Sequence, residues 1–259
     1  MLDLMLFKTV PCKNPSSHNP KKCFYYHEAK TKDQRRVPNS YVSELCNSVL
    51  TQTACPDGDG CHKCHNRVEE FYHPEKYKSK FCATYPDNVD QCEYGEMCAF
   101  AHAESELTVP QLDKMEKDSD FYMFHFKTAW CPFSDKEHQR DQCVYAHNWQ
   151  DYRRPPHVFE YSNSQCQSWE TKKNTRTYGD GCRLEYRCGQ CHGWKELEYH
   201  PACYKTSECR IPVGGQCRKS HCPFYHSEKD RRTPQTNPYF KLFPRNRGSA
   251  HGHVYSYAK

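Results

Sequence analysis

The sequence predicts a chain of small, mostly irregular units that bound metal, rather than an apolar core, holds together. Leu, Ile, Val and Phe make up about 14% of the 259 residues, and a chain below about 20% usually cannot fill a core. Disorder is the default for such a composition unless another interaction stabilises it. The 19 cysteines and 16 histidines offer that interaction, and they recur in six similar sets. We therefore expect six metal-stapled fingers with short helical turns, in two modules of three.

Metal is favoured over disulfides because the cysteine count is odd and the histidines are numerous. An odd count cannot pair completely within one chain, and a disulfide framework gives the histidines no role. The first ten residues carry an acid, Asp3, and too few apolar residues for an export signal. No stretch approaches the ~18 apolar residues of a membrane span. We expect a soluble intracellular protein in a reducing compartment, the cytoplasm rather than the nucleus.

Each set contains four ligands and ends in C-x3-H. The constant last gap suits a single tight turn, whereas the first gap varies as a surface loop can. A closed tetrahedral set of thiolates and imidazoles is what structural zinc requires, so we expect six Zn²⁺ per chain. The predicted ligands of fingers one to six are, in order, Cys12, His18, Cys23 and His27; Cys46, Cys55, Cys61 and His65; Cys82, Cys92, Cys98 and His102; Cys131, His138, Cys143 and His147; Cys166, Cys182, Cys188 and His192; Cys209, Cys217, Cys222 and His226.

The order of the sets repeats in two halves. Each half starts with a set whose second ligand is histidine, followed by a set with a spare cysteine, Cys64 or Cys191, before its last histidine. We expect these two spares to be small buried fillers. After the first set of each half comes a connector with an acid, two arginines and a proline. This internal repeat predicts two three-finger modules rather than six independent fingers.

The module boundaries follow from the repeat. We expect the first module at residues 1–108 and the second at 121–230, with a basic tail at 231–259. The connecting segment, residues 109–120, has apolar residues at helical spacing and a proline in the first turn, so we predict a linker there that contains a short helix.

The net charge of +5 comes from the end of the chain. Residues 1–226 carry 30 basic and 30 acidic side chains, and residues 227–259 carry seven basic and two acidic ones. Proteins that bind duplex DNA usually present a basic face. Nucleic-acid binding by these fingers would instead depend on stacking and on hydrogen bonds to base edges, which favours unpaired strands.

Aromatic and basic residues stand at fixed places in the fingers. An aromatic residue precedes the first ligand by five positions in every set, and it either shields zinc or contacts RNA. Another lies inside C-x3-H in four sets, where we favour base stacking. Lysines after the leading aromatics are placed to meet phosphates, and the arginine pairs are either solvated connectors or contacts to phosphates or to the packed protein. The predicted RNA contacts are Phe7, Lys8, Tyr25, Arg35, Arg36, Tyr77, Lys78, Phe100, Phe126, Lys127, Tyr145, Arg153, Arg154, Tyr204, Lys205 and Phe224.

These motifs resemble a known family. The YK-x3-C and FKT-x2-C leaders and the C-x7–9-C-x5-C-x3-H spacing are similar to CCCH zinc fingers of the tristetraprolin type. The stretch CHKCHNRVEEFYHPEKYKSKFC resembles the Unkempt family and the arginine-rich tandem CCCH fingers of plants more specifically. The resemblance implies clusters of three CCCH or CHCH fingers that recognise short single-stranded RNA, often rich in U. Fingers two and five lack the aromatic inside C-x3-H, and finger six is one residue short, so we expect these three to be structural.

We predict zinc-dependent, non-enzymatic binding of single-stranded RNA, in the regulation of messenger RNA. Zinc with four protein ligands has no position for an activated water, which argues against an RNA-cleaving enzyme. The alternative is a structural zinc-finger subunit of a ribonucleoprotein assembly, in which the fingers contact both RNA and protein partners and the basic tail enters the assembly.

Overall fold

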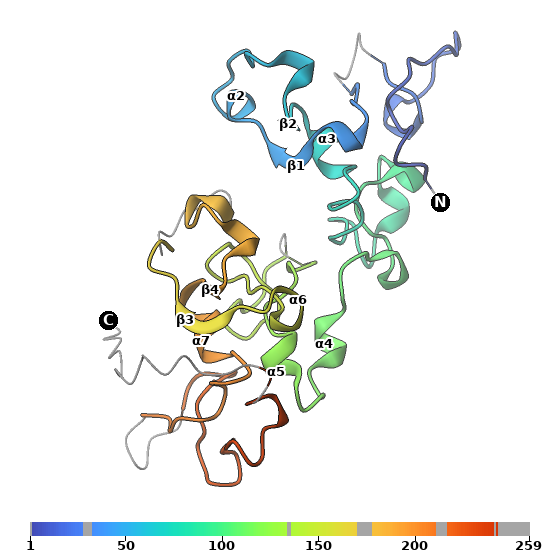
Figure 1. The fold of residues 1–259 in the computed structure, drawn as a ribbon. Helices are drawn as coiled ribbons and strands as arrows, with labels where there is room; N and C mark the ends of the chain where they lie inside the picture. Colours follow the sequence, from blue (N-terminus) through green and yellow to red (C-terminus); the bar gives the residue numbers. More distant parts are fainter. Residues whose placement is uncertain are drawn as a thin grey trace. The chain divides into compact units, whose positions relative to one another are not determined.

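Regular secondary structure is sparse and short in the computed structural model (Figure 1), which describes residues 2–27, 33–133, 136–169, 178–210, 217–240 and 242. The α-helices and strands are β1 (Val42–Leu45), α2 (Asn47–Leu50), β2 (Lys63–Cys64), α3 (Arg67–Phe71), α4 (Leu112–Met115), α5 (Phe121–Phe124), α6 (Pro156–Phe159), β3 (Ser162–Gln165), β4 (Gln190–Cys191) and α7 (Gly193–Glu198). The 3-10 turns span Pro20–Lys22, Pro38–Ser40, Gly58–Gly60, Val89–Gln91, Gly95–Met97, Glu104–Glu106, Tyr178–Asp180, Glu185–Arg187 and Pro238–Phe240. The predicted fold class, irregular units with short helical turns, is confirmed.

All six fingers are closed by the same backbone hydrogen bond. The N–H of the first cysteine donates to the carbonyl of the residue before the last histidine, over 2.9–3.0 Å. In fingers two and five this pairing extends into two-stranded parallel sheets, β1 with β2 and β3 with β4. In the other four fingers it appears as an isolated parallel bridge. The C-x3-H turn therefore lies beside the start of its finger in every repeat.

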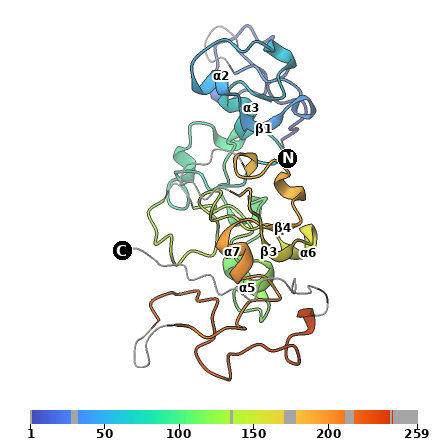
Figure 2. The same ribbon diagram turned by 60° about the vertical axis from the view of Figure 1, so that its left-hand side comes forward.

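The chain divides into two compact units. The first comprises Met1–Pro110 with Pro132–Lys136, and the second comprises Gln111–Cys131 with the chain from Glu137 onward. Each unit has small, aromatic-rich apolar clusters. One in the first unit is built on Phe7 and Tyr72, whereas one in the second is built on Trp169 and Tyr178 beside three cysteines of finger five. In the second unit, α7 packs on β3 and β4, as both views show (Figures 1 and 2).

The segment predicted as a linker contains the one-turn helix α4 and packs within the second unit. Leu112 of this helix is fully buried. Its neighbour Asp113 accepts a hydrogen bond from the hydroxyl of Tyr145 in finger four. The predicted short helix is therefore present, but its side chains are part of the packing of finger four rather than a solvated connection.

Candidate metal centres and nucleic-acid interface

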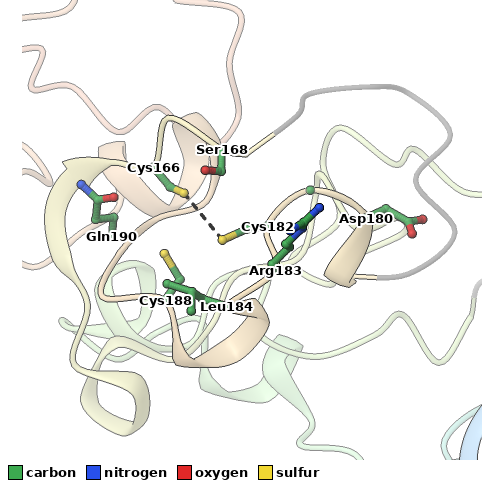
Figure 3. Close-up of a pocket in the computed structure, with 9 residues that line it drawn as sticks. Cys166, Ser168, Asp180, Cys182, Arg183, Leu184, Cys188 and Gln190 are labelled. Carbon is green, nitrogen blue, oxygen red and sulfur yellow. Dashed lines mark hydrogen bonds between the residues drawn. The ribbon is translucent and has the colours of Figure 1, made fainter.

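The predicted zinc ligands converge in the structure. In fingers one to five, the four ligand atoms of each predicted set lie within 4.8 Å of one another. The sulfur atoms of Cys12 and Cys23 are 3.8 Å apart, and so are those of Cys166 and Cys182, which face each other in Figure 3. Two sulfurs bound to one tetrahedral zinc at about 2.3 Å lie about 3.8 Å apart, whereas disulfide sulfurs lie about 2 Å apart. The geometry fits zinc.

Finger six gathers its cysteines in the same way. The sulfur of Cys209 lies 3.9 Å from that of Cys217 and 3.8 Å from that of Cys222. Part of the loop between the first two cysteines, residues 211–216, is outside the described residues. All 19 cysteines are free thiols in the structure, so the disulfide alternative is not supported anywhere in the chain.

The histidine rings present Nε2 to these centres. The Nε2 atoms of His65, His102 and His192 are buried, and no hydrogen bond reaches them within the described part of the chain. A buried polar atom normally has a partner, and a metal ion would supply it here. The other ring nitrogen of His192 lies 2.8 Å from the hydroxyl of Tyr178, which holds the ring in place as is usual for metal-bound histidine. Burial lowers the pKa of His192 to about 3, so the imidazole is neutral, as ligation requires.

A carboxylate supports the last histidine of every finger, and the sequence analysis missed it. In five fingers an acid four residues after the histidine accepts a hydrogen bond from the histidine backbone N–H, as in the 2.6 Å bond from His192 to Glu196. In finger one, Asp33 does this from six residues away, at 2.8 Å from the N–H of His27. The recurrent signal H-x3-[D/E] was available in the sequence. The other four acids are Glu69, Glu106, Asp151 and Asp230.

The leader lysines bind these carboxylates instead of facing solvent. The ammonium of Lys8 lies 2.6 Å from Asp33 and donates to two backbone carbonyls at 2.9 Å. All four lysines have a left-handed φ between 55° and 63°, a conformation that persists only when surrounding contacts enforce it. Because Lys8, Lys78 and Lys127 are buried, their predicted role as phosphate contacts is corrected to an internal one. Lys205 pairs with Asp230 at 2.9 Å and is partly exposed.

Arginines replace these lysines in fingers two and five. Arg154 makes two hydrogen bonds to Glu196, at 2.7 and 2.9 Å, and donates to the carbonyls of Cys188 and Gln190 at 2.5 and 2.6 Å. Burial opposes its charge, but the bonds to Glu196 raise the pKa of Arg154 above its ordinary value. Arg36 binds Glu69 and the equivalent carbonyls of its own finger in the same way.

The preceding arginines join fingers within each unit. Arg35 donates to the carbonyls of Leu4 and Tyr72 at 2.5 and 2.6 Å. Arg153 donates to those of Phe126 and Tyr199 at 2.7 and 3.0 Å. Arg35, Arg153 and Arg154 are at most 2% exposed. The structure therefore contradicts the interpretation of the arginine pairs as solvated connectors and shows them as packing contacts. These three guanidinium groups are not available to phosphates, and Arg36 is mostly enclosed as well.

Most leading aromatics are packing residues. Phe7 lies 4.3 Å from Tyr72 between ring centroids, and Phe126 lies 4.6 Å from Tyr199. Both are buried, as is Tyr204, whereas Tyr77 is partly exposed. Shielding is therefore the role that the structure supports for the buried rings, because no face is left open to a base.

The aromatics inside C-x3-H divide into two groups. Tyr145 is 2% exposed and bonds Asp113 of α4, so the predicted stacking site of finger four is covered by the chain itself. Tyr25 is 46% exposed. Phe100 and Phe224 are partly exposed. The predicted stacking residues that remain accessible are therefore those of fingers one, three and six.

The spare cysteines are internal. Cys64 and Cys191 are fully buried, and each thiol donates to a carbonyl at 3.1 Å, that of Val42 or that of Ser162. Burial raises the pKa of the Cys64 thiol to about 12, which makes it a poor nucleophile. The prediction of buried fillers is confirmed.

The insertion of finger five shields its metal centre. Trp169 stacks on His192 with ring centroids 4.3 Å apart, and Tyr178 bonds the same histidine. Residues 170–177, the rest of this insertion up to Tyr178, lie outside the described residues. Figure 3 shows Cys166, Cys182 and Cys188 gathered together, and Arg183 and Leu184, which line the same pocket, are exposed.

Repeated four-ligand Cys/His centres, each ending in C-x3-H, are the pattern of tandem CCCH zinc fingers. A family model described as "AtC3H23-like, CCCH zinc finger" matches residues 120–154. The chain is similar to the protein named putative E3 ubiquitin-protein ligase UNKL of Mus musculus, with 27% identity over 86% of this chain and 39% of the relative. It is also similar to the RING finger protein unkempt of Drosophila melanogaster, with 25% identity over 82% of this chain and 43% of the relative.

A plant protein shares a shorter region with the chain. Zinc finger CCCH domain-containing protein 20 of Arabidopsis thaliana is 35% identical over 46% of this chain and 30% of its own length. The chain thus spans less than half the length of each of these relatives. Among the described residues, no helix has the length and apolar character needed to cross a membrane.

Proposed function

We propose that the protein binds single-stranded RNA through the accessible rings of the C-x3-H turns, Tyr25, Phe100 and Phe224. The observation that carries this proposal is that the zinc centres and their buried cations anchor the backbone on both sides of rings that stay open to solvent. A ring held in this way can stack on a base without an ordering cost, and such stacking contributes about 1–3 kcal/mol per base.

Finger one supplies the most open of these surfaces. A hollow of about 600 Å³ that includes the metal centre is lined by the ligands Cys12, His18 and Cys23 and, around them, by Lys13, Lys22 and Tyr25, among others. Lys13 and Lys22 are exposed, so they are able to meet phosphates that the buried leader lysines cannot reach. An exposed aromatic ring between two exposed lysines can stack on a base while the lysines contact the adjoining phosphates.

Several features support unpaired RNA as the ligand. The finger region has balanced charge, and many of its lysines and arginines are used internally, which leaves little basic surface for a duplex. We propose short single strands, with U-rich ones as the first to test, and a role in regulating messenger RNA in the cytoplasm. Each described centre has four protein ligands, which leaves zinc no open position, so we propose a binding rather than a catalytic role. The words "E3 ubiquitin-protein ligase" in the name of the mouse relative describe that longer protein.

Replacement of Tyr25 by alanine should weaken binding of a fluorescent seven-nucleotide U-rich RNA. Loss of one stacked base predicts a decrease in affinity of about 5- to 150-fold, measured by fluorescence anisotropy on the zinc-loaded protein. Tyr94→Ala is the matched control because Tyr94 is 42% exposed but lies outside any C-x3-H turn.

Equal affinities for Tyr25→Ala, Tyr94→Ala and the unmodified protein would contradict the proposed surface. If the unmodified protein binds no oligomer at all until protein partners are added, the alternative of a structural subunit of a ribonucleoprotein assembly is favoured instead.

A further inference from the structure

The last residue of α7, Glu198, differs in character from its counterpart in the first unit. The two units align at His65 and His192, and this alignment places Glu198 at the position of Phe71, the last residue of α3. Phe71 packs on Phe100, the C-x3-H ring of finger three, with centroids 5.2 Å apart. The second unit therefore has a carboxyl group where the first has an aromatic ring that supports its stacking residue.

One carboxylate oxygen of Glu198 has no hydrogen-bond partner among the described residues. This atom, Oε2, is buried. Desolvation raises the pKa of Glu198 to about 7, and the nearby charge of Lys219 offsets this only in part. A buried acceptor without a donor is costly, and this one is exceptional among the acids of the second unit, because Asp151 and Glu196 have several donors each.

Two aromatic rings accompany this carboxyl group. The ammonium of Lys219 lies 5.8 Å from the ring centroid of Trp194, at the start of α7, and 5.9 Å from that of Phe224, the C-x3-H ring of finger six. Both rings are partly exposed, and Lys219 is exposed. The site thus combines two π-faces, an exposed cation and a carboxyl group with one oxygen that accepts no hydrogen bond from the described residues.

The four bases differ in the hydrogen-bond donors that they can offer to a carboxylate. At a pH above its raised pKa, the carboxyl group of Glu198 is ionised and has two acceptor oxygens and no donor. Guanine presents two adjacent donors, N1–H and the N2 amino group, on its Watson–Crick edge. Uracil places one N–H between two carbonyl oxygens, and in adenine and cytosine the amino group lies beside an acceptor nitrogen. Only guanine offers donors to both carboxylate oxygens without opposing an acceptor.

We propose that Trp194, Glu198, Lys219 and Phe224 form a guanine-selective site for single-stranded RNA in the second unit. The base stacks on Phe224, its N1–H and N2–H donate to Glu198, and Lys219 moves to a flanking phosphate. This inference rests on the proposed RNA-binding function and adds a specificity-determining residue to it. The first unit has Phe71 at the equivalent position and therefore no carboxyl group there.

The test compares the affinities of the zinc-loaded full chain for four RNA heptamers, U7 and U7 with a central G, A or C. The central G is expected to bind at least about 10-fold tighter than U7, because hydrogen bonds to a charged group are the strong ones. Glu198→Gln keeps the shape of the side chain but turns one acceptor into a donor, and it should remove the preference for G while binding of U7 is retained. Glu208→Gln, at an exposed glutamate of the same unit, should leave the preference intact.

The possible failures are distinguishable. If U7 binds but the central G gives no advantage, or if the advantage survives in Glu198→Gln, guanine selection by Glu198 is overturned while the proposed RNA binding stands. If none of the four heptamers binds, the proposed function itself fails and this inference with it. Glu198→Phe, which reproduces the arrangement of the first unit, provides a second variant that should bind U7 and the G-containing heptamer equally.

Discussion

Removal of zinc should unfold both units of the protein. The apolar clusters are small, and each finger is closed around four ligand atoms that repel or lack partners when no metal is present. Structural zinc contributes roughly 10–16 kcal/mol of apparent binding free energy in small fingers, which is as large as the whole stability of an ordinary domain, about 5–15 kcal/mol. An excess of chelator is therefore expected to abolish the cooperative thermal transition, followed by near-UV circular dichroism. The same chelator saturated with zinc is the control, and a melt that the free chelator leaves unchanged would contradict the metal-based fold.

Two neighbouring cysteines in finger two, of which only one is a predicted ligand, test zinc binding at a single residue. Cys61 is a predicted ligand with its sulfur 3.8 Å from that of Cys46, whereas Cys64 donates to a backbone carbonyl. Native mass spectrometry should find one zinc fewer in Cys61→Ser than in the unmodified protein. Cys64→Ser should keep the full number, because a serine hydroxyl can also donate to the carbonyl of Val42. Equal zinc content in the two variants would show that Cys61 is not a zinc ligand.

Replacement of Arg154 by methionine should destabilise the second unit by about 3–5 kcal/mol, the usual cost of breaking a buried ion pair by removing one partner. Arg154 and Glu196 are fully enclosed, so the variant leaves a carboxylate without its cation and deprives the carbonyls of Cys188 and Gln190 of donors. Denaturant unfolding of the zinc-loaded protein measures the change. Arg183→Met is the matched control, because Arg183 is exposed in the same finger.

This substitution also separates a phosphate contact from a packing contact. Replacement of a phosphate contact would weaken RNA binding and leave the stability unchanged, whereas replacement of a packing contact lowers the stability first. Unchanged unfolding of Arg154→Met together with weakened RNA binding would therefore reverse the assignment made from the structure.

Zinc coordination was predictable from the sequence because its physical requirements are local. A tetrahedral centre needs four soft or borderline ligands, and the short fixed gap of C-x3-H already brings two of them together in one turn. The spare cysteines were predictable as well, since Cys64 and Cys191 occupy the same place in each repeat but exceed the four ligands. In five fingers the acid that supports the last histidine was visible in the sequence as H-x3-[D/E], but its role depends on a hydrogen bond that only the folded turn shows.

The predicted RNA contacts were less reliable because they depend on burial. Lysine and arginine are normally exposed, and Lys8 and Arg153 gave no local sign that carbonyls and carboxylates from distant segments would enclose them. Tyr145 has the same place in its finger as Tyr25, yet Asp113, 32 residues earlier in the chain, covers it. Residue type and spacing therefore could not tell an open ring from a closed one.

The amino-acid order alone determined the number of metal centres, their ligands and the twofold repeat, because ligand chemistry and spacing act over a few residues. Only the tertiary structure decided which charged and aromatic side chains remain available to a partner, since the exposure of a side chain depends on what the rest of the fold packs against it.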